Sequence, residues 1–290
     1  YFMSDIKIFI ELTRLNKPIG YMLLFWPCSW GLAYSFSLNQ DILFFFYYLI
    51  LFFIGSVLMR SAGCIFNDIV DKDFDSKVAR TKKRPIASGR ITVRRSLFYV
   101  FVLCFLAFII LLQFNLLTIA LGLGSMFLAF AYPYMKRITY WPQLFLGLTF
   151  NWGIIMSWTA MNGFLTNEIF ILYFSAIFWT LGYDTIYGAQ DMYDDEIIGL
   201  KSTSLKFKKN IKLFVSISYL VSSFLIFFFL INFVGVNWSF ILLMLFIFSL
   251  FYQVYKFNKN DSKSCLNAFK FNNISGMILF LTILSTNFYQ

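Results

Sequence analysis

Long apolar stretches run through the whole chain and leave very few folds open to it. Each is close to the roughly 20 residues that a helix needs to cross a hydrocarbon core of about 30 Å. The stretches are continuously apolar, whereas the strands of a membrane β-barrel alternate between apolar and polar residues. Transmembrane helices are therefore predicted. We find nine such stretches, at residues 19–38, 42–66, 96–113, 115–132, 142–161, 167–188, 211–231, 238–255 and 272–288.

The composition supports a membrane-embedded class. Hydrophobic residues make up 60% of the 290 residues and charged residues only 13%, whereas a soluble domain carries about 25% charged residues. Soluble enzymes, disordered chains and basic nucleic-acid-binding domains are disfavoured on this ground. We expect an all-α polytopic membrane protein in which residues 1–290 form one domain of nine transmembrane helices, with the lipid bilayer and no nucleic acid as a partner.

Basic residues fall in alternate connections between the apolar stretches. They precede the first stretch and occupy the connections at 72–95, 136–137, 201–212 and 256–270, whereas the connections at 39–41, 114–115, 162–166 and 232–237 carry no Lys or Arg. Under the positive-inside rule, the N-terminus and the basic connections face the cytoplasm and the C-terminus faces the other side. The first 18 residues show no cleavage site, so we expect no cleaved signal peptide.

The residue types that are missing remove several kinds of chemistry. The chain has no histidine, and its four cysteines are not at metal-ligand spacing. His-ligated haem, His-based zinc sites and a Ser-His-Asp triad are therefore excluded. We expect four free thiols and no disulfide.

Carboxylates are scarce, and most of them lie in two short windows. Nine of the 14 Asp and Glu residues fall within residues 67–75 and 184–196, each at the predicted cytoplasmic end of an apolar stretch. If the helices continue through these windows, residues four apart share a face. That spacing groups Asn67, Asp71 and Asp75 in the first window, and Asp184, Tyr187, Asp191 and Asp195 in the second.

Such acidic faces indicate that a cation binds between them. Carboxylates stacked at this spacing repel and raise one another's pKa, so we expect that an Asp→Asn change maintains or raises stability without metal. A solvated helix end is the simpler interpretation, but the negative end of the helix dipole makes acids costly there. Ligand sets made of oxygen atoms select hard cations, and Mg²⁺ often completes its shell with substrate phosphate oxygens. The two windows therefore indicate a magnesium-bound diphosphate at the membrane surface.

Several motifs carry a family resemblance. The pattern Asn67-Asp68-x-x-Asp71-x-x-x-Asp75, followed by residues 80–89 (RTKKRPIASG), resembles the first signature of the UbiA family of intramembrane aromatic prenyltransferases. Residues 187–195 (YGAQDMYDD) resemble the second signature. Residues 14–20 (RLNKPIG) and 132–137 (YPYMKR) are similar to the branch of the family that acts on 4-hydroxybenzoate. The resemblance runs from residue 14 to about residue 205.

The resemblance implies a nine-helix bundle with two Mg²⁺ ions in a bacterial inner membrane. It implies that a polyprenyl group passes from polyprenyl diphosphate to 4-hydroxybenzoate, ortho to the hydroxyl, in ubiquinone biosynthesis. Naphthoate or haem as the acceptor is the alternative within the family. A cation transporter is a rival class, but it predicts acids near mid-membrane, where we place only Asp184. Membrane phosphotransferases also use paired Asp motifs, but their Asp-Gly and Ala-Arg elements are absent between Asp68 and Asp75.

Candidate site residues follow from the motifs. We expect Asn67, Asp71 and Asp75 to hold one Mg²⁺ ion, and Asp191 and Asp195 to hold the other. Asp68 and Asp194 are alternative ligands, or they hydrogen-bond the residues that bind the metal. Arg60, the only basic residue in the interior of an apolar stretch, is the candidate for the acceptor carboxylate, although it could equally snorkel or pair with an acid. Basic connections are expected from topology alone, so each diphosphate candidate has a simpler explanation. The diphosphate candidates are Arg80, Lys82, Lys136 and Arg137, Asp184 is a further substrate-binding candidate, and the catalytic candidates are Asp191, Arg137 and Tyr187.

Overall fold

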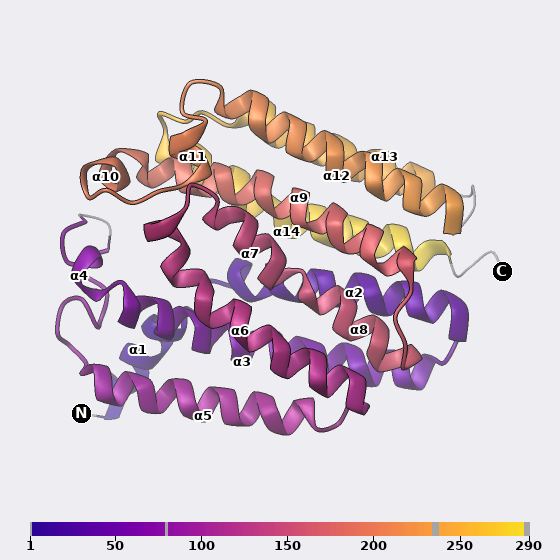
Figure 1. The fold of residues 1–290 in the computed structure, drawn as a ribbon, viewed down its shortest axis with the longest axis horizontal. Coiled ribbons are helices and arrows are strands. Elements are labelled where there is room, and N and C mark those ends of the chain that lie inside the picture. The colour runs from indigo at the N-terminus through magenta and orange to yellow at the C-terminus, as the bar shows by residue number, and fades with distance from the viewer. Residues whose placement is uncertain (1, 79–80, 234–237, 287–290) are drawn as a thin grey trace.

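The computed structural model describes residues 2–78, 81–233 and 238–286 and is all-helical there. Its membrane-length helices pack as an elongated bundle (Figure 1). Short helices fill the connections at one end of this bundle. The helices are α1 (Phe2–Thr13), α2 (Ile19–Asn39), α3 (Ile42–Val70), α4 (Lys72–Asp75), α5 (Val93–Leu111), α6 (Leu116–Ile138), α7 (Pro142–Phe150), α8 (Trp152–Asn162), α9 (Asn167–Gly188), η1 (Ala189–Asp191), α10 (Met192–Ile197), α11 (Thr203–Lys206), α12 (Ile211–Phe233), α13 (Ser239–Lys256) and α14 (Ser262–Ser285).

Eight helical stretches of the described chain are long and apolar enough to cross a membrane. The predicted stretch at 19–38 forms α2, which is 21 residues long but carries Ser, Trp, Tyr and Pro, and most of its residues are buried. A helix enclosed by others does not have to be as apolar as one that faces lipid. The predicted all-α membrane class is therefore confirmed.

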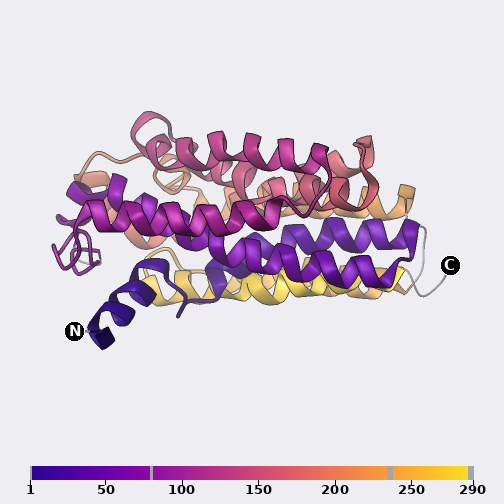
Figure 2. The same ribbon diagram turned by 90° about the horizontal axis from the view of Figure 1, so that it is seen from below.

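All basic connections gather at one end of the bundle. Figures 1 and 2 show α4, α10, α11 and the N-terminus at that end, while the α2–α3, α5–α6 and α8–α9 connections lie at the opposite end. We call these the basic end and the uncharged end, where the second name means that its connections carry no Lys or Arg, although Asp41 lies there. The alternation of charge along the sequence thus becomes a separation of charge in space.

Local sequence signals set the ends of several helices. The side chains of Asp41, Thr92 and Asn115 accept hydrogen bonds from backbone N–H groups in the first turns of α3, α5 and α6. Gly163 follows α8 with a φ of +75°, which is the left-handed backbone conformation that glycine adopts most readily. Asp41, Asn115 and Gly163 therefore separate the apolar stretches at the uncharged end, whereas Thr92 caps α5 at the basic end.

The interior of the bundle is built from large aromatic side chains. Trp30, Trp158 and Trp179 are buried, and the rings of Trp30 and Trp179 lie 5.0 Å apart between centroids. Leu43 and Phe127, in contrast, are 80% and 81% exposed. Because lipid tails and these side chains are both apolar, an outward-facing Leu or Phe is favourable in a bilayer and unfavourable in water.

Two predicted spans differ from the structure. The stretch at 142–161 is divided into α7 and α8 at Asn151, whose backbone N–H and side-chain Nδ2 both donate to the carbonyl oxygen of Gly147. The last span was expected to begin at residue 272, but α14 begins at Ser262. Its first ten residues include Ser, Asn and Lys, which lower the hydropathy without preventing a helix.

Candidate active site

One cavity of about 1220 Å³ connects the two acidic windows with the middle of the bundle. Its walls come from the α1–α2 connection and from α2, α3, α5, α6, α7, α8, α9 and α14. Polar side chains line it toward the basic end, and apolar ones line it deeper between the helices. The polar lining includes Arg14, Arg60, Asn67, Asp68, Asp75, Arg84, Tyr132, Lys136, Gln143, Asp184, Tyr187, Asp191, Asp195 and Lys270.

In the first window, the acids do not share one face. The helix expected to continue through this window is interrupted at Asp71, where α3 ends and the short α4 begins. Asn67, Asp68 and Asp75 line the cavity. Asp71 is 1% exposed and does not line the cavity. The interruption therefore separates Asp71 from the residues that were expected to act with it.

Arginines from two other segments neutralise Asp68 and Asp75. Arg14 Nη2 lies 2.5 Å from Asp68 Oδ1, and Arg84 Nη1 lies 3.0 Å from the same oxygen. Arg84 Nη1 also lies 2.7 Å from Asp75 Oδ2. Burial raises the pKa of Asp75 above its ordinary value, while the charge of Arg84 opposes that rise. The two arginines are thus the counter-ions of these carboxylates.

Asp71 is held by two basic residues of α6. Lys136 Nζ donates to Asp71 Oδ2, and Arg137 Nη2 lies 3.3 Å from Asp71 Oδ1. Arg137 Nη2 also donates to the carbonyl oxygen of Val70 at 2.7 Å, and its guanidinium lies over the Phe74 ring, 4.9 Å from the centroid. Arg137, a catalytic and diphosphate candidate, therefore closes the end of α3 and does not line the cavity.

These contacts change the electrostatic expectation for the first window. The sequence pattern implies mutual repulsion of carboxylates, and hence that an amide substitution maintains or raises stability. In the structure, Arg14, Arg84, Lys136 and Arg137 surround three buried carboxylates. Loss of a carboxylate would leave a partly buried cation without its partner, so the premise of unrelieved repulsion is wrong.

The second window surrounds the cavity as its spacing predicts. Asp184, Tyr187, Asp191 and Asp195 all line it, whereas Asp194 does not. α9 ends at Gly188 and continues through η1 into α10, so the chain remains helical across most of the window. The Tyr187 ring packs on a phenylalanine of α14, with 4.5 Å between ring centroids.

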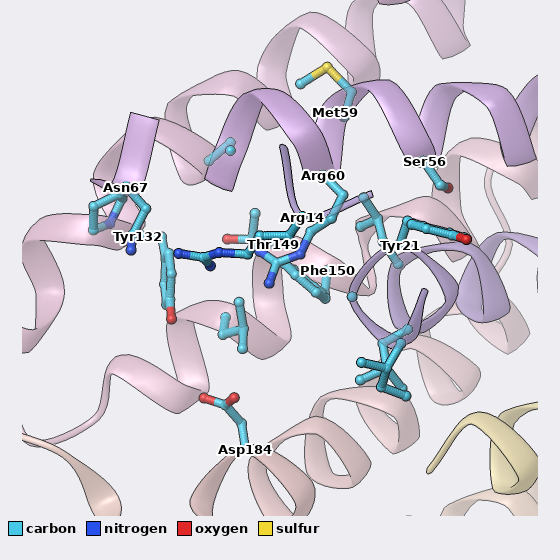
Figure 3. A pocket seen from close by; sticks show the side chains of 18 of the residues that line it. Arg14, Tyr21, Ser56, Met59, Arg60, Asn67, Tyr132, Thr149, Phe150 and Asp184 are labelled. Carbon is cyan, nitrogen blue, oxygen red and sulfur yellow. The ribbon is translucent and has the colours of Figure 1, made fainter. Parts of the chain in front are cut away.

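Arg60 points into the middle of the cavity. Figure 3 shows its guanidinium directed into the same space as the side chains of Tyr132 and Asp184. Arg60 Nε is buried and has no hydrogen-bond partner in the described chain, and the guanidinium lies 5.4 Å from the centroid of the Phe150 ring. A Cβ on Gly20 would come within 2.9 Å of that Nε, so glycine leaves room for the arginine. Arg60 is thus an inward-facing cation and does not snorkel.

The basic connection between α4 and α5 contributes a residue that sequence reasoning did not select. Lys82 is exposed and does not line the cavity, and Arg80 lies outside the described residues. Arg84, in contrast, pairs with both Asp68 and Asp75, and Arg14 pairs with Asp68. Both belong to the motifs that carry the family resemblance, but a basic residue in a basic connection has no feature that marks it as buried.

The donor atoms of the cavity suit a hard cation but are not assembled around one. Their chemistry is that of carboxylate and amide oxygens, which Mg²⁺ prefers. Within the described ranges, no group of three His, Cys, Asp or Glu residues is close enough to hold a metal by itself. A Mg²⁺ ion at this site would therefore take its remaining oxygen ligands from water and from substrate phosphate.

Comparison with known proteins decides the family. The sequence model described as "UbiA prenyltransferase family" matches residues 24–275. This chain belongs to the UbiA prenyltransferase family. It is 43% identical to the mitochondrial 4-hydroxybenzoate polyprenyltransferase of Bos taurus, covering 96% of this chain and 75% of the relative. It is 40% identical to the 4-hydroxybenzoate octaprenyltransferase of Psychromonas ingrahamii, covering 94% of both.

Solved structures of other UbiA homologues share the fold. The apo structure of a homologue from Aeropyrum pernix has a TM-score of 0.76 at 22% identity, covering 92% of this chain and 98% of that one. A homologue from Archaeoglobus fulgidus bound to GPP and Mg²⁺ has a TM-score of 0.70 at 14% identity, covering 96% and 99%. The bundle is therefore the UbiA fold, and this integral membrane protein is placed in a family of prenyltransferases.

Proposed function

We propose that this protein transfers a polyprenyl group from polyprenyl diphosphate to 4-hydroxybenzoate in a Mg²⁺-dependent reaction of ubiquinone biosynthesis. The observation that carries the proposal is a single cavity that unites two acidic windows, an inward-facing arginine and an apolar interior. Relatives at about 40% identity that are named for this activity support it. The individual roles below are part of the same proposal.

The diphosphate is placed between the two acidic windows. Asn67, Asp68 and Asp75 would hold one Mg²⁺ and Asp191 with Asp195 the other, because these residues line the cavity. When bound, the metal supplies charge neutralisation for the leaving diphosphate. Arg14, Arg84 and Lys136 also line the cavity, so they can exchange a carboxylate for a diphosphate oxygen with a small movement of their flexible side chains.

The apolar interior suits the prenyl tail. Leu51 and Phe52 of α3, Phe108 and Leu111 of α5, and Met126 of α6 line this arm of the cavity. Phe108 and Leu123 of α6 line the cavity and are still 39% and 49% exposed. We place an opening of this arm between α5 and α6, through which a tail longer than the cavity would extend into the bilayer.

The acceptor is placed at Arg60. The guanidinium would pair with the carboxylate of 4-hydroxybenzoate, and Asp184 and Tyr187 lie on the facing wall as partners for its phenol. The C–O bond between the allylic carbon and diphosphate breaks, and the ring carbon ortho to the phenol forms a C–C bond to that carbon. The ring proton passes to a carboxylate, for which Asp191 is proposed, and diphosphate leaves.

The proposed orientation in the membrane rests on the distribution of basic residues. The basic end, which holds the mouth of the cavity, would face the cytoplasm of a bacterial inner membrane, with the N-terminus on the same side and the end of α14 on the other. A water-soluble aromatic acid would then reach the site from the cytoplasm. The separation of basic and uncharged connections supports this orientation.

Turnover by the purified protein in nanodiscs tests the proposal. Prenylated 4-hydroxybenzoate should form from a polyprenyl diphosphate only when Mg²⁺ is present, and naphthoate should serve poorly or not at all. Absence of product with every aromatic acid tested would refute the proposed reaction.

Arg60→Gln gives the sharper test of the acceptor site. Loss of a buried charge-assisted hydrogen bond of about 1.5–3 kcal/mol should raise the KM for 4-hydroxybenzoate by about 10- to 150-fold. The KM for the diphosphate should change little. Arg95→Gln is a matched control, because Arg95 is 50% exposed, pairs with Asp5 and lies outside the cavity. An unchanged acceptor KM would exclude Arg60 as the carboxylate site.

A further inference from the structure

Lys270 is a basic residue that the proposed reaction has not used. The apolar pattern places it in a connection, but α14 begins at Ser262, so Lys270 lies about 12 Å along a membrane-length helix. A lysine at this depth is costly unless its ammonium faces water or an opposite charge. Ionisable residues inside membrane helices therefore often mark the path of a ligand.

Hydrogen bonds fix the wall that carries Lys270. Trp26 Nε1 of α2 donates to Asn273 Oδ1 at 2.9 Å. Trp179 Nε1 of α9 donates to Asn272 Oδ1 at 2.9 Å. The two tryptophans bind successive residues of α14 from two neighbouring helices, so the part of α14 just beyond Lys270 is held in place.

Lys270 lines the cavity beside the second acidic window. The preceding residue, Phe269, packs on the ring of Tyr187, and α14 also contacts η1, which carries Asp191. The side chain of Lys270 is exposed, and it has no hydrogen bond or ion pair within the described part of the chain. It is therefore an available cation at the edge of the cavity.

The position of α14 indicates which of the two substrate anions Lys270 can contact. The cations that pair with the first window lie on α6 and on the α1–α2 and α4–α5 connections, whereas α14 packs with α2, α9 and α13 (Figure 1). The diphosphate already has cations on the first wall, and its tail needs the apolar arm between α3, α5 and α6. The remaining anion is the carboxylate of the aromatic acid, which arrives from water.

We infer that Lys270 captures the carboxylate of the aromatic acceptor at the edge of the cavity, before the acceptor reaches Arg60. The inference rests on the proposed function, whose acceptor site it extends. Attraction by a fixed cation raises the local concentration of an anionic substrate and weakens as salt is added. Lys270 thus acts on acceptor binding and not on the chemical step.

Kinetics of K270Q in nanodiscs test this role. The KM for 4-hydroxybenzoate should rise about 2- to 5-fold, as expected for an exposed charge pair, and the difference should shrink in high salt. The kcat and the KM for the diphosphate should stay the same, and K270R should restore the acceptor KM. K263Q is the matched control, because Lys263 is an exposed lysine in the first turn of α14 and does not line the cavity.

A neutral acceptor and a binding titration complete the experiment. With 4-hydroxybenzamide, which lacks the carboxylate, wild type and K270Q should have the same KM. An increased KM for the diphosphate, or an unchanged acceptor KM, would overturn the inference. Equilibrium binding of 4-hydroxybenzoate separates this result from the proposed function. If wild type binds the acid more tightly than K270Q but no product forms, the capture site stands and the reaction is refuted, whereas equal binding refutes the capture site.

Discussion

Asp68 joins two arginines from segments far apart in sequence. Arg14 precedes α2 and Arg84 lies between α4 and α5, and both donate to Asp68 Oδ1. Because Asp68 is 2% exposed, the desolvation cost of its charge must be offset by these partners. The same cations are the ones we propose for the diphosphate, so their pairing with acids would link the stability of the protein to the geometry of the proposed site.

Asp71→Asn tests the structural side of this link. The variant leaves Lys136 and Arg137 without their shared carboxylate, so the free energy of unfolding without Mg²⁺ should fall by about 1–3 kcal/mol. Thermal unfolding in detergent, monitored by circular dichroism, measures the change. Asp73→Asn is the control, since Asp73 is exposed and has no ion pair in the described chain. Equal or higher stability of Asp71→Asn would restore the idea of repelling acids.

Sequence reasoning at this scale found the acids but not their partners. The four-residue spacing of the second window predicted a common face, and its residues line the cavity because α9, η1 and α10 keep the chain helical across most of the window. The first window failed this rule at Asp71, where α3 ends. The pairing of Arg84 with Asp75 depends on how the basic connection folds back, and hydropathy and charge patterns carry no information about that path.

At the scale of helices, close approach depends on small residues. Gly31 of α2 faces α8, where an added Cβ would lie 2.6 Å from the carbonyl oxygen of Ile154 and 2.2 Å from Ser157 Oγ. Backbone atoms cannot move aside as a flexible side chain can. α2 also contacts α3 and α14, so its position sets the width of the cavity between them.

Gly31→Ala should therefore separate α2 from α8. We expect a loss of about 1–3 kcal/mol in the free energy of unfolding, as for an overpacked core, together with reduced turnover. Gly124→Ala is the matched control, because Gly124 lies in α6 with no atom within 4 Å of an added Cβ. The control should be neutral or slightly stabilising, since alanine favours helix over glycine. Equal unfolding temperatures for the two variants would refute the tight contact.

The helices themselves were predictable from apolar length, but their interruptions were not. Asn151 divides α7 from α8 because its side chain bonds to Gly147 and to Thr180 Oγ1 of α9, a contact that only the folded bundle provides. The start of α14 was missed because its first turns are polar. Those turns include Lys270, which lies at the cavity and not in lipid. Average hydropathy cannot distinguish a polar helix segment beside a cavity from a loop.

At the scale of the whole molecule, the basic connections and the candidate site lie at the same end of the bundle. The basic end carries both acidic windows and the polar lining of the cavity, while the uncharged end carries short polar caps. The apolar outer surface fixes the depth of the bundle in the bilayer but not its direction. Under the positive-inside rule direction depends on the basic connections, so we expect the charge pattern to decide the side on which the proposed acceptor enters.

Labelling of single cysteines in intact bacterial cells tests this orientation. The four native cysteines are free, and three of them are buried, so they can be replaced by serine or alanine before one exposed cysteine is introduced. A membrane-impermeant maleimide should label Asn39→Cys and Leu116→Cys in intact cells, because both positions lie at the uncharged end, which faces outward under the positive-inside rule. Lys208→Cys and Lys259→Cys should be labelled only after the membrane is opened. Labelling of the lysine positions in intact cells would place the mouth of the cavity outside and would refute entry of the acceptor from the cytoplasm, whatever the activity of the purified protein.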